Sequence, residues 1–250
     1  MMKRLLMCLF LAVAGLALAG PVQAETVING IDKDYPPFAY INEKGKIVGF
    51  DVESMDWIAK KMGFTVEHKP YEWKTIVQMV VENKIQMVCS GMSITAERAK
   101  QVNFSDPYWT VRKVFVAKKG SDLNSEKILN DKVRLGVQQG TNEDAMLQDM
   151  VKEGKANFTL VQYATSSDAI ADLLNGRIVA VALDSAPAEN AMRAGRPVQE
   201  VGIFGEVDEF GVAVNKSNPE LLKKINEGYT LLKADPYWIE LQKKYNLSGN

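Results

Sequence analysis

The most chemically suggestive stretch of the chain runs from Ile85 to Tyr108, where a cation, Arg98, follows a group of small polar residues. An apolar run, Ile85 to Cys89, predicts a strand, and Thr95 is placed to cap a helix whose first turn holds Arg98. A cation in that turn opposes the helix dipole, at a cost of about 0.3–1 kcal/mol. Such an arginine indicates an anion nearby, which free hydroxyl and N–H groups between the strand and the helix could help to hold. The alternative is a surface arginine offset by Glu97.

Alternating strand and helix patterns along the chain predict an α/β fold that would position these groups. Strands are expected at 27–31, 85–89, 114–117, 133–137, 158–161, 178–183 and 210–214. Helices are expected at 50–62 and 73–82, after Thr95 and Thr141, from Ser167 to a stop at Gly176, and after Asn218-Pro219 and Asp235-Pro236. In open α/β units, ligands lie beyond the C-terminal ends of the strands. Ser90, Thr141 and Asp184 each follow such an end.

The first residues have the pattern of a secretory signal peptide. Lys3 and Arg4 precede a mostly apolar, uncharged run from Leu5 to Leu18, and Val22-Gln23-Ala24 offers small residues at a cleavage position. We therefore expect a protein exported to the periplasm, with residues 1–24 removed by cleavage after Ala24. An uncleaved anchor is the alternative, but the apolar run is short for a membrane span.

Composition argues against several classes of function. The formal net charge of −1 gives no electrostatic case for a nucleic-acid or anionic-membrane partner. Cys89 follows the predicted cleavage site and is expected to be a small core residue. His68 is the one histidine, so no zinc cluster, Cys/His pair or Ser/His/Asp triad can be assembled. We expect no catalytic residue, metal or cofactor.

Three stretches taken together resemble a known family. They are DKDYPPF (32–38), GFDVE (49–53), and SGMSITAER (90–98) followed by FSDPY (104–108). This combination resembles the family 3 extracellular solute-binding proteins, the periplasmic polar amino-acid-binding proteins of ABC importers, over essentially the whole mature chain. One departure is Ser54, where the helix of that family usually carries an apolar residue.

The resemblance implies a two-lobe periplasmic-binding-protein type II fold, with a hinge and a ligand cleft between α/β lobes. Lobe 1 would be discontinuous, residues 25–111 plus 209–250, and lobe 2 would span residues 112–208. The ligand would lie in the cleft while the lobes close over it.

The same resemblance implies how the two charged ends of an amino acid would be held. Arg98 would bind the α-carboxylate, assisted by Ser93 and by backbone N–H groups of the loop Ser90, Gly91, Met92 and Ser93. Thr141 and the helix start after it would hold the same carboxylate from the other lobe. Asp184 would accept the α-ammonium; the alternative is that it caps the helix beginning at Ser185.

The positions that match the side-chain pocket of the family are Asp32, Tyr35, Trp73, Gln138 and Asn142. The rings of Tyr35 and Trp73 would flank the ligand side chain; their alternative is core packing. Asp32 would contact its polar end, or is a turn residue. Gln138 stands where residues vary with the ligand. Asn142 departs from the small residue usual at its position, which leaves its target open.

Because no lysine or arginine occupies these pocket positions, we expect a polar neutral or cationic amino acid as the free ligand. The partner would be an inner-membrane ABC permease, and the protein a monomer. Two alternatives remain from sequence. One is a cyclohexadienyl or arogenate dehydratase-like enzyme on the same fold, with Glu143 as a conceivable general acid or else a first-turn residue that favours the helix dipole. The other is the ligand-sensing input of a receptor.

Overall fold

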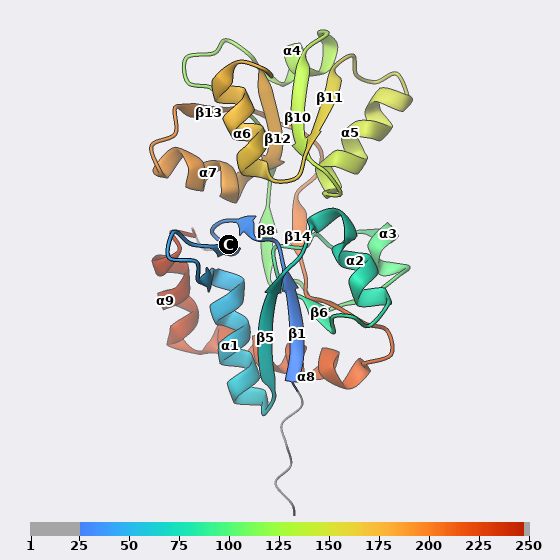
Figure 1. Cartoon of the computed structure of the whole chain (residues 1–250), viewed down its shortest axis with the longest axis vertical. Coiled ribbons are helices and arrows are strands. Elements are labelled where there is room, and N and C mark those ends of the chain that lie inside the picture. Colours follow the sequence, from blue (N-terminus) through green and yellow to red (C-terminus); the bar gives the residue numbers. More distant parts are fainter. Residues whose placement is uncertain (1–25, 248–250) are drawn as a thin grey trace, which may run out of the picture.

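The structure is a computed structural model that describes residues 26–247. Figure 1 shows two lobes stacked along the long axis of the molecule. Each lobe is built around a five-stranded sheet with helices beside it, which confirms the predicted two-lobe α/β fold. The predicted signal peptide lies outside the described residues. Within residues 26–247, no helix is both long enough and apolar enough to cross a membrane.

The lower lobe in Figure 1, lobe 1, contains a sheet with strand order β5-β1-β6-β15-β7. Its strands are β1 (Thr26–Ile31), β5 (Thr65–Pro70), β6 (Met87–Val88), β7 (Asn103–Phe104) and β15 (Ala213–Val214). Strand β1 pairs in parallel with β5 and β6, whereas β15 runs antiparallel to β6 and β7. Since β15 comes from late in the chain, this sheet joins two separate stretches of sequence.

Helices and a small sheet complete lobe 1. The helices are α1 (Phe50–Met62), α2 (Trp73–Val81), α3 (Ala96–Ala99), α8 (Pro219–Ala234) and α9 (Pro236–Lys244), and the small sheet contains β2 (Asp34–Tyr35), β3 (Ala39–Ile41) and β4 (Ile47–Val48). Prolines in the first turns of α8 and α9 follow the capping side chains of Asn218 and Asp235, as predicted. Thr95 caps α3 by accepting the N–H of Arg98, also as predicted.

The upper lobe, lobe 2, contains a sheet with strand order β11-β10-β12-β9-β13. Its strands are β9 (Lys113–Lys118), β10 (Arg134–Gln138), β11 (Thr159–Tyr163), β12 (Ala180–Asp184) and β13 (Val198–Ile203), and its helices are α4 (Ser125–Asn130), α5 (Asn142–Lys152), α6 (Ser166–Asn175) and α7 (Ser185–Arg193). Strands β10 and β12 are almost continuously buried, as expected for central strands with helices on both faces.

Two strands connect the lobes. They are β8 (Trp109–Val111) and β14 (Asp208–Phe210), which pair antiparallel with Val111 opposite Asp208. Figure 1 shows both between the lobes. At their lobe 1 end, Trp109 and Phe210 join Phe38 and Phe50 in an aromatic cluster whose ring centroids lie 5.2–6.2 Å apart. This cluster fixes the connecting strands to the core of lobe 1.

Cys89 is fully buried as a free thiol, as expected for a core residue. The predicted strand around it is shorter than the apolar run suggested. The N–H of Cys89 donates to the side chain of Asn29 (2.7 Å) rather than to the backbone of a neighbouring strand. The strand β6 therefore ends at Val88, before Cys89.

Two further expectations differ from the structure. The run 210–214 is not one strand: β14 ends at Phe210 and β15 starts at Ala213, because the N–H of Gly211 between them bonds to Met92 (3.0 Å). The cap of α6 is Thr165 rather than Ser167, since the Thr165 hydroxyl accepts the N–H of Asp168 (3.1 Å).

Candidate ligand-binding site

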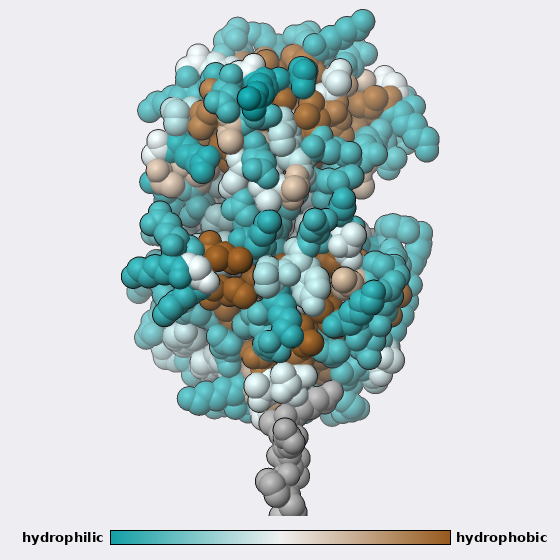
Figure 2. Space-filling view, in the orientation of Figure 1, coloured by the Kyte–Doolittle hydropathy of each residue, from teal (hydrophilic) through white to brown (hydrophobic). Residues whose placement is uncertain are grey.

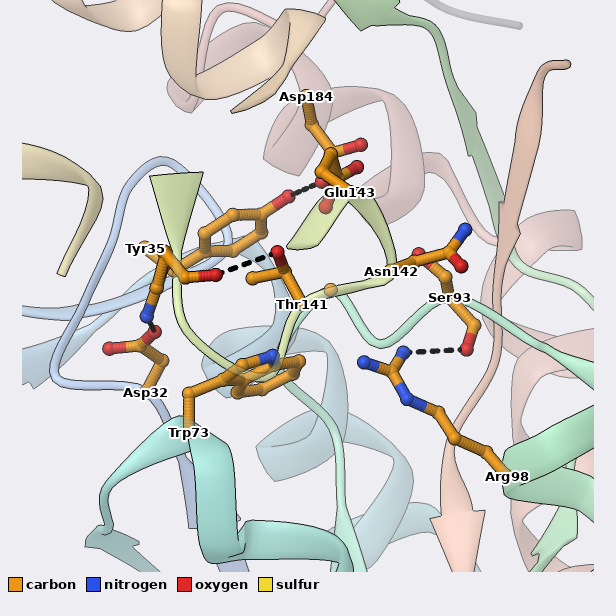
Figure 3. A pocket seen from close by; sticks show the side chains of 11 residues that line it. Asp32, Tyr35, Trp73, Ser93, Arg98, Thr141, Asn142, Glu143 and Asp184 are labelled. Carbon is orange, nitrogen blue, oxygen red and sulfur yellow. Dashed lines mark hydrogen bonds between the residues drawn. The ribbon is translucent and has the colours of Figure 1, made fainter. Parts of the chain in front are cut away.

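A small cavity lies between the lobes. Residues from lobe 1 and lobe 2 line it together: Asp32, Tyr35, Trp73, Gly91, Ser93 and Arg98, then Gln138, Thr141, Asn142, Glu143 and Asp184. Figure 3 shows their side chains converging, and Figure 2 shows a largely hydrophilic face hollowed along one edge between the lobes. All but two of the residues predicted to contact a ligand line this cavity; the exceptions are Ser90 and Met92.

Arg98 reaches the cavity from the short helix α3. Its guanidinium donates to the carbonyl of Ser93 (2.9 Å) and, across the cleft, to the carbonyl of Gly140 (3.2 Å). It also lies 5.8 Å from the ring centroid of Trp73. Glu97 pairs with Lys100 instead (2.8 Å), so the alternative of a surface arginine offset by Glu97 is wrong. Burial lowers the pKa of Arg98, although nearby acids oppose that shift.

A buried carboxylate, Asp51, holds the loop before α3 by a hydrogen bond to its backbone. Gly91 has a φ of +60°, and a Cβ there would lie 2.3 Å from the Tyr35 ring. The N–H of Gly91 donates to Asp51 (2.6 Å) in α1, which places this glycine against the cavity. Ser90 uses its hydroxyl to accept the N–H of Asp32 (3.0 Å), and Met92 is fully buried among apolar side chains. Ser90 and Met92 do not line the cavity, and their ligand contacts, like those of the residues that do, stay predictions.

Two side-chain hydrogen bonds join the lobes directly across the cavity. The hydroxyl of Tyr35 donates to Asp184 in a very short bond, and the amide of Gln138 donates to Asp32 (2.6 Å). Burial raises the pKa of Tyr35 well above its ordinary value. Burial also raises the pKa of Asp32 above its ordinary value. The described conformation is therefore closed, and its own polar groups partly satisfy one another.

Several alternatives from the sequence can be weighed against these contacts. Asp184 stands at the N-cap position of α7 but makes no capping hydrogen bond. Asp32 does form a turn, accepting the N–H of Asp34 (2.9 Å), yet its other oxygen faces Gln138. Tyr35 and Trp73 each pack in a core cluster and also line the cavity. Core packing and cavity lining are thus compatible for both rings.

The start of α5 forms much of the lobe 2 wall. Thr141 caps this helix, accepting the N–H of Asp144 (3.2 Å) and donating to the carbonyl of Gln138 (2.9 Å). The side-chain amide of Asn142 donates to Asp208 (2.8 Å) in the connecting strand β14. Asn142 therefore lines the cavity and also links the start of α5 to the connecting strand β14.

Acidic side chains gather on the same wall. The carboxylates of Glu143, Asp184 and Asp208 each place an oxygen within 4.8 Å of the others. Asp208 is paired with the buried ammonium of Lys113, so a metal ion would compete with that ammonium. Burial, followed by the charge of Glu143, raises the pKa of Asp184 well above its ordinary value. A cation bound at this wall would stabilise the ionised form of Asp184.

Glu143 was absent from the predicted ligand contacts, although it is only 3 % exposed and lines the cavity. An acidic residue in the first turn of a helix is already explained by its favourable interaction with the helix dipole, so the sequence offered no separate reason to place Glu143 in the cavity. Its place after Thr141, itself just beyond a buried strand, was the one available signal.

Comparisons with known proteins agree with this geometry. Residues 27–248 match the family model described as bacterial extracellular solute-binding proteins, family 3. A putative ABC transporter arginine-binding protein 2 of Escherichia coli K12 is 30 % identical over 240 residues, which cover 93 % of this chain and 95 % of that protein.

Solved structures are similar as well. An ancestral arginine-binding protein bound to arginine has a TM-score of 0.81 and 35 % identity, covering 88 % of this chain and 97 % of that one. An ancestral amino acid-binding protein, described as a precursor of cyclohexadienyl dehydratase, has a TM-score of 0.79 and 30 % identity, covering 88 % and 95 %. The chain therefore belongs to the bacterial extracellular solute-binding proteins of family 3, as its motifs predicted.

Proposed function

We propose that this protein captures a free polar amino acid between its lobes and delivers it to an inner-membrane ABC permease. In this proposal the first lobe comprises residues 25–111 and 209–250, and the second comprises residues 112–208. The protein acts as a monomer, and the strands β8 and β14 provide the hinge about which the lobes close.

The observation that carries the proposal is the pairing of opposite charges on opposite walls of one cavity. Arg98 in lobe 1 offers a planar guanidinium that suits a carboxylate, and Asp184 in lobe 2 offers a carboxylate that suits an ammonium. An α-amino acid carries both groups on one carbon atom. Because the two partners belong to different lobes, only the closed protein satisfies both ends of the ligand.

The remaining cavity residues support a neutral or cationic side chain. Asp32 and Gln138 provide an acidic and an amide group, and the rings of Tyr35 and Trp73 provide apolar surface for a methylene chain. Among residues 26–247, no lysine lines the cavity, and the arginine that does, Arg98, is assigned to the α-carboxylate. Relatives named for arginine binding favour L-arginine as the first ligand to test, followed by lysine, histidine and glutamine.

Titration calorimetry of the exported protein against a panel of amino acids tests this proposal. We expect saturable one-to-one binding of at least one polar neutral or cationic amino acid. Preferential binding of glutamate or aspartate would contradict the assigned specificity. Absence of binding by every amino acid in the panel, from a sample first unfolded and refolded to remove retained ligand, would refute the function itself.

We also propose export to the periplasm with cleavage after Ala24. The amino-terminal pattern and membership of an extracellular family support this localisation. Intact-mass measurement of the protein from a periplasmic extract tests it: a chain starting at Glu25 is expected, and a mass that retains residues 1–24 contradicts cleavage.

We further propose that the protein is not an enzyme. A dehydratase needs a general acid beside the leaving hydroxyl, and Glu143 lines the cavity where such an acid would lie. Dehydratase activity should therefore be measured. Incubating purified protein with prephenate or arogenate should yield no product above the uncatalysed rate. Turnover that disappears in Glu143→Gln would overturn this part of the proposal.

A further inference from the structure

Glu143 is in the first turn of α5 but is not the residue that caps this helix. Its neighbour Asp144 occupies the helix start, accepting the N–H of Gly140 (2.9 Å) and hydrogen bonds from the side chains of Gln148 (2.8 Å) and Gln162 (2.7 Å). The capping role belongs to Thr141. The Glu143 carboxyl lies instead beside that of Asp184 in the cavity, as Figure 3 shows.

Glu143 and Asp184 each retain a buried oxygen that has no hydrogen-bond partner among residues 26–247. These atoms are Oε1 of Glu143 and Oδ1 of Asp184, on side chains of residues only 3 % and 6 % exposed. Within the described residues, neither carboxylate has an ion pair at hydrogen-bonding distance, whereas Asp208 beside them is paired with Lys113. Two adjacent buried carboxyl groups with free oxygens form an incomplete arrangement, because buried polar atoms are normally hydrogen-bonded.

Groups from three other elements face this pair. Tyr35 of β2 donates its hydroxyl to Asp184, Arg98 of α3 is near enough to interact electrostatically, and Asp208 of β14 adds a neutralised acid. The guanidinium of Arg98 already donates to two backbone carbonyls. The arrangement therefore lacks a cation with several N–H donors.

We infer that Glu143 is a specificity-determining residue that forms, together with Asp184, a two-carboxylate site for the α-ammonium of the ligand. This inference rests on the proposed function and deepens it. An ammonium has three N–H donors and a full charge, so it can satisfy both unpartnered oxygens at once. A hydroxyl has one donor and no charge, so a 2-hydroxy acid leaves one carboxylate unsatisfied. A site built around such polar groups rejects an analogue that lacks their partner.

The test compares two ligands on matched variants by calorimetry. The ligands are the tightest-binding amino acid of the panel and the 2-hydroxy acid with the same side chain. Glu143→Gln keeps the size of the side chain but removes its charge, and Glu143→Asp keeps the charge. The control is Asp149→Asn, which removes an exposed acid from the same helix.

We expect Glu143→Gln to weaken binding of the amino acid by about 30-fold or more, in the range for loss of one partner of a buried charge pair. Binding of the 2-hydroxy acid should change by less than about 3-fold, and Asp149→Asn should change neither. Glu143→Asp should retain a larger share of amino-acid affinity than Glu143→Gln. Thermal unfolding confirms that each variant is folded.

Equal losses for the two ligands, or an unchanged affinity for the amino acid, would overturn the role of Glu143. Those outcomes leave binding by the unmodified protein intact. Failure of the unmodified protein to bind any amino acid refutes the proposed function instead, and with it this inference.

Discussion

Replacing Asp51 with asparagine should reduce the fall in the protein's stability as pH rises. Asp51 is completely buried in α1, where one oxygen accepts the N–H of Gly91 (2.6 Å) and the hydroxyl of Tyr108 (2.7 Å). Its other oxygen has no hydrogen-bond partner in the part of the chain that the structure describes. Burial raises the pKa of Asp51 from 3.8 to about 7, against the opposing effect of these two hydrogen bonds.

The sign and size of the effect follow from proton linkage. Between pH 3.8 and about 7 the folded protein binds more protons at Asp51 than the unfolded chain, so stability falls as pH rises through this window. A shift of about 3 units costs about 4 kcal/mol once the pH exceeds 7, of which about 3 kcal/mol is lost between pH 5 and pH 8. An asparagine side chain cannot ionise, so Asp51→Asn should lack this decline.

Urea unfolding followed by tryptophan fluorescence, at pH 5 and pH 8, measures the difference. The absolute stability of Asp51→Asn is less informative, because its amide brings N–H donors to a site without a free acceptor. Asp131→Asn, at an exposed position, is the control and should reproduce the pH dependence of the unmodified protein. Parallel pH profiles for Asp51→Asn and the unmodified protein would refute the assignment of a raised pKa to Asp51.

Three further predictions concern ligand binding. Arg98→Ala should weaken amino-acid binding by about 3–5 kcal/mol, because the ligand carboxylate loses its buried charge partner; near-normal affinity in calorimetry would reject the assignment. Affinity should rise with pH, since an ammonium favours the ionised form of Asp184 and burial raises the pKa of that carboxyl group; an affinity that does not rise with pH in calorimetry would contradict this. Gly140→Ala should weaken binding about 10-fold or more, because a Cβ would lie 2.6 Å from the backbone of Lys74 in the other lobe and obstruct closure. Its control is Gly154→Ala, at a similar φ of +71° with nothing near the added Cβ; equal affinities for the two variants would argue against obstruction.

The principal charges of the site could be predicted from sequence because their local signals are strong. Arg98 stands against a helix dipole, and Asp184 ends a buried strand, so the position of each along the chain made it a candidate for contact with a ligand. The family motifs then assigned them to opposite lobes. Prolines after capping residues likewise predicted the starts of α8 and α9.

Contacts that depend on lobe closure could not be predicted in this way. Gly140 reads as a turn residue, and only the closed arrangement places it against Lys74 and beneath the guanidinium of Arg98. Ser167 reads as a helix cap, but its hydroxyl donates across the lobes to Asp34 (3.0 Å). A one-dimensional pattern reports local periodicity and not which surfaces of two separate lobes meet.

The closed conformation uses for itself some of the groups proposed to hold the ligand. Tyr35 donates to Asp184, Gln138 donates to Asp32, and Arg98 donates to the carbonyl of Gly140. An entering amino acid must replace or join these bonds, so its affinity reflects the difference between ligand contacts and contacts between the lobes. Removing one of these bonds, as in Tyr35→Phe, therefore changes both the stability of the closed form without ligand and the contacts available to the ligand. A ligand gains most where the closed protein leaves polar groups unsatisfied, and the free oxygens of Glu143 and Asp184 make the acidic wall such a place.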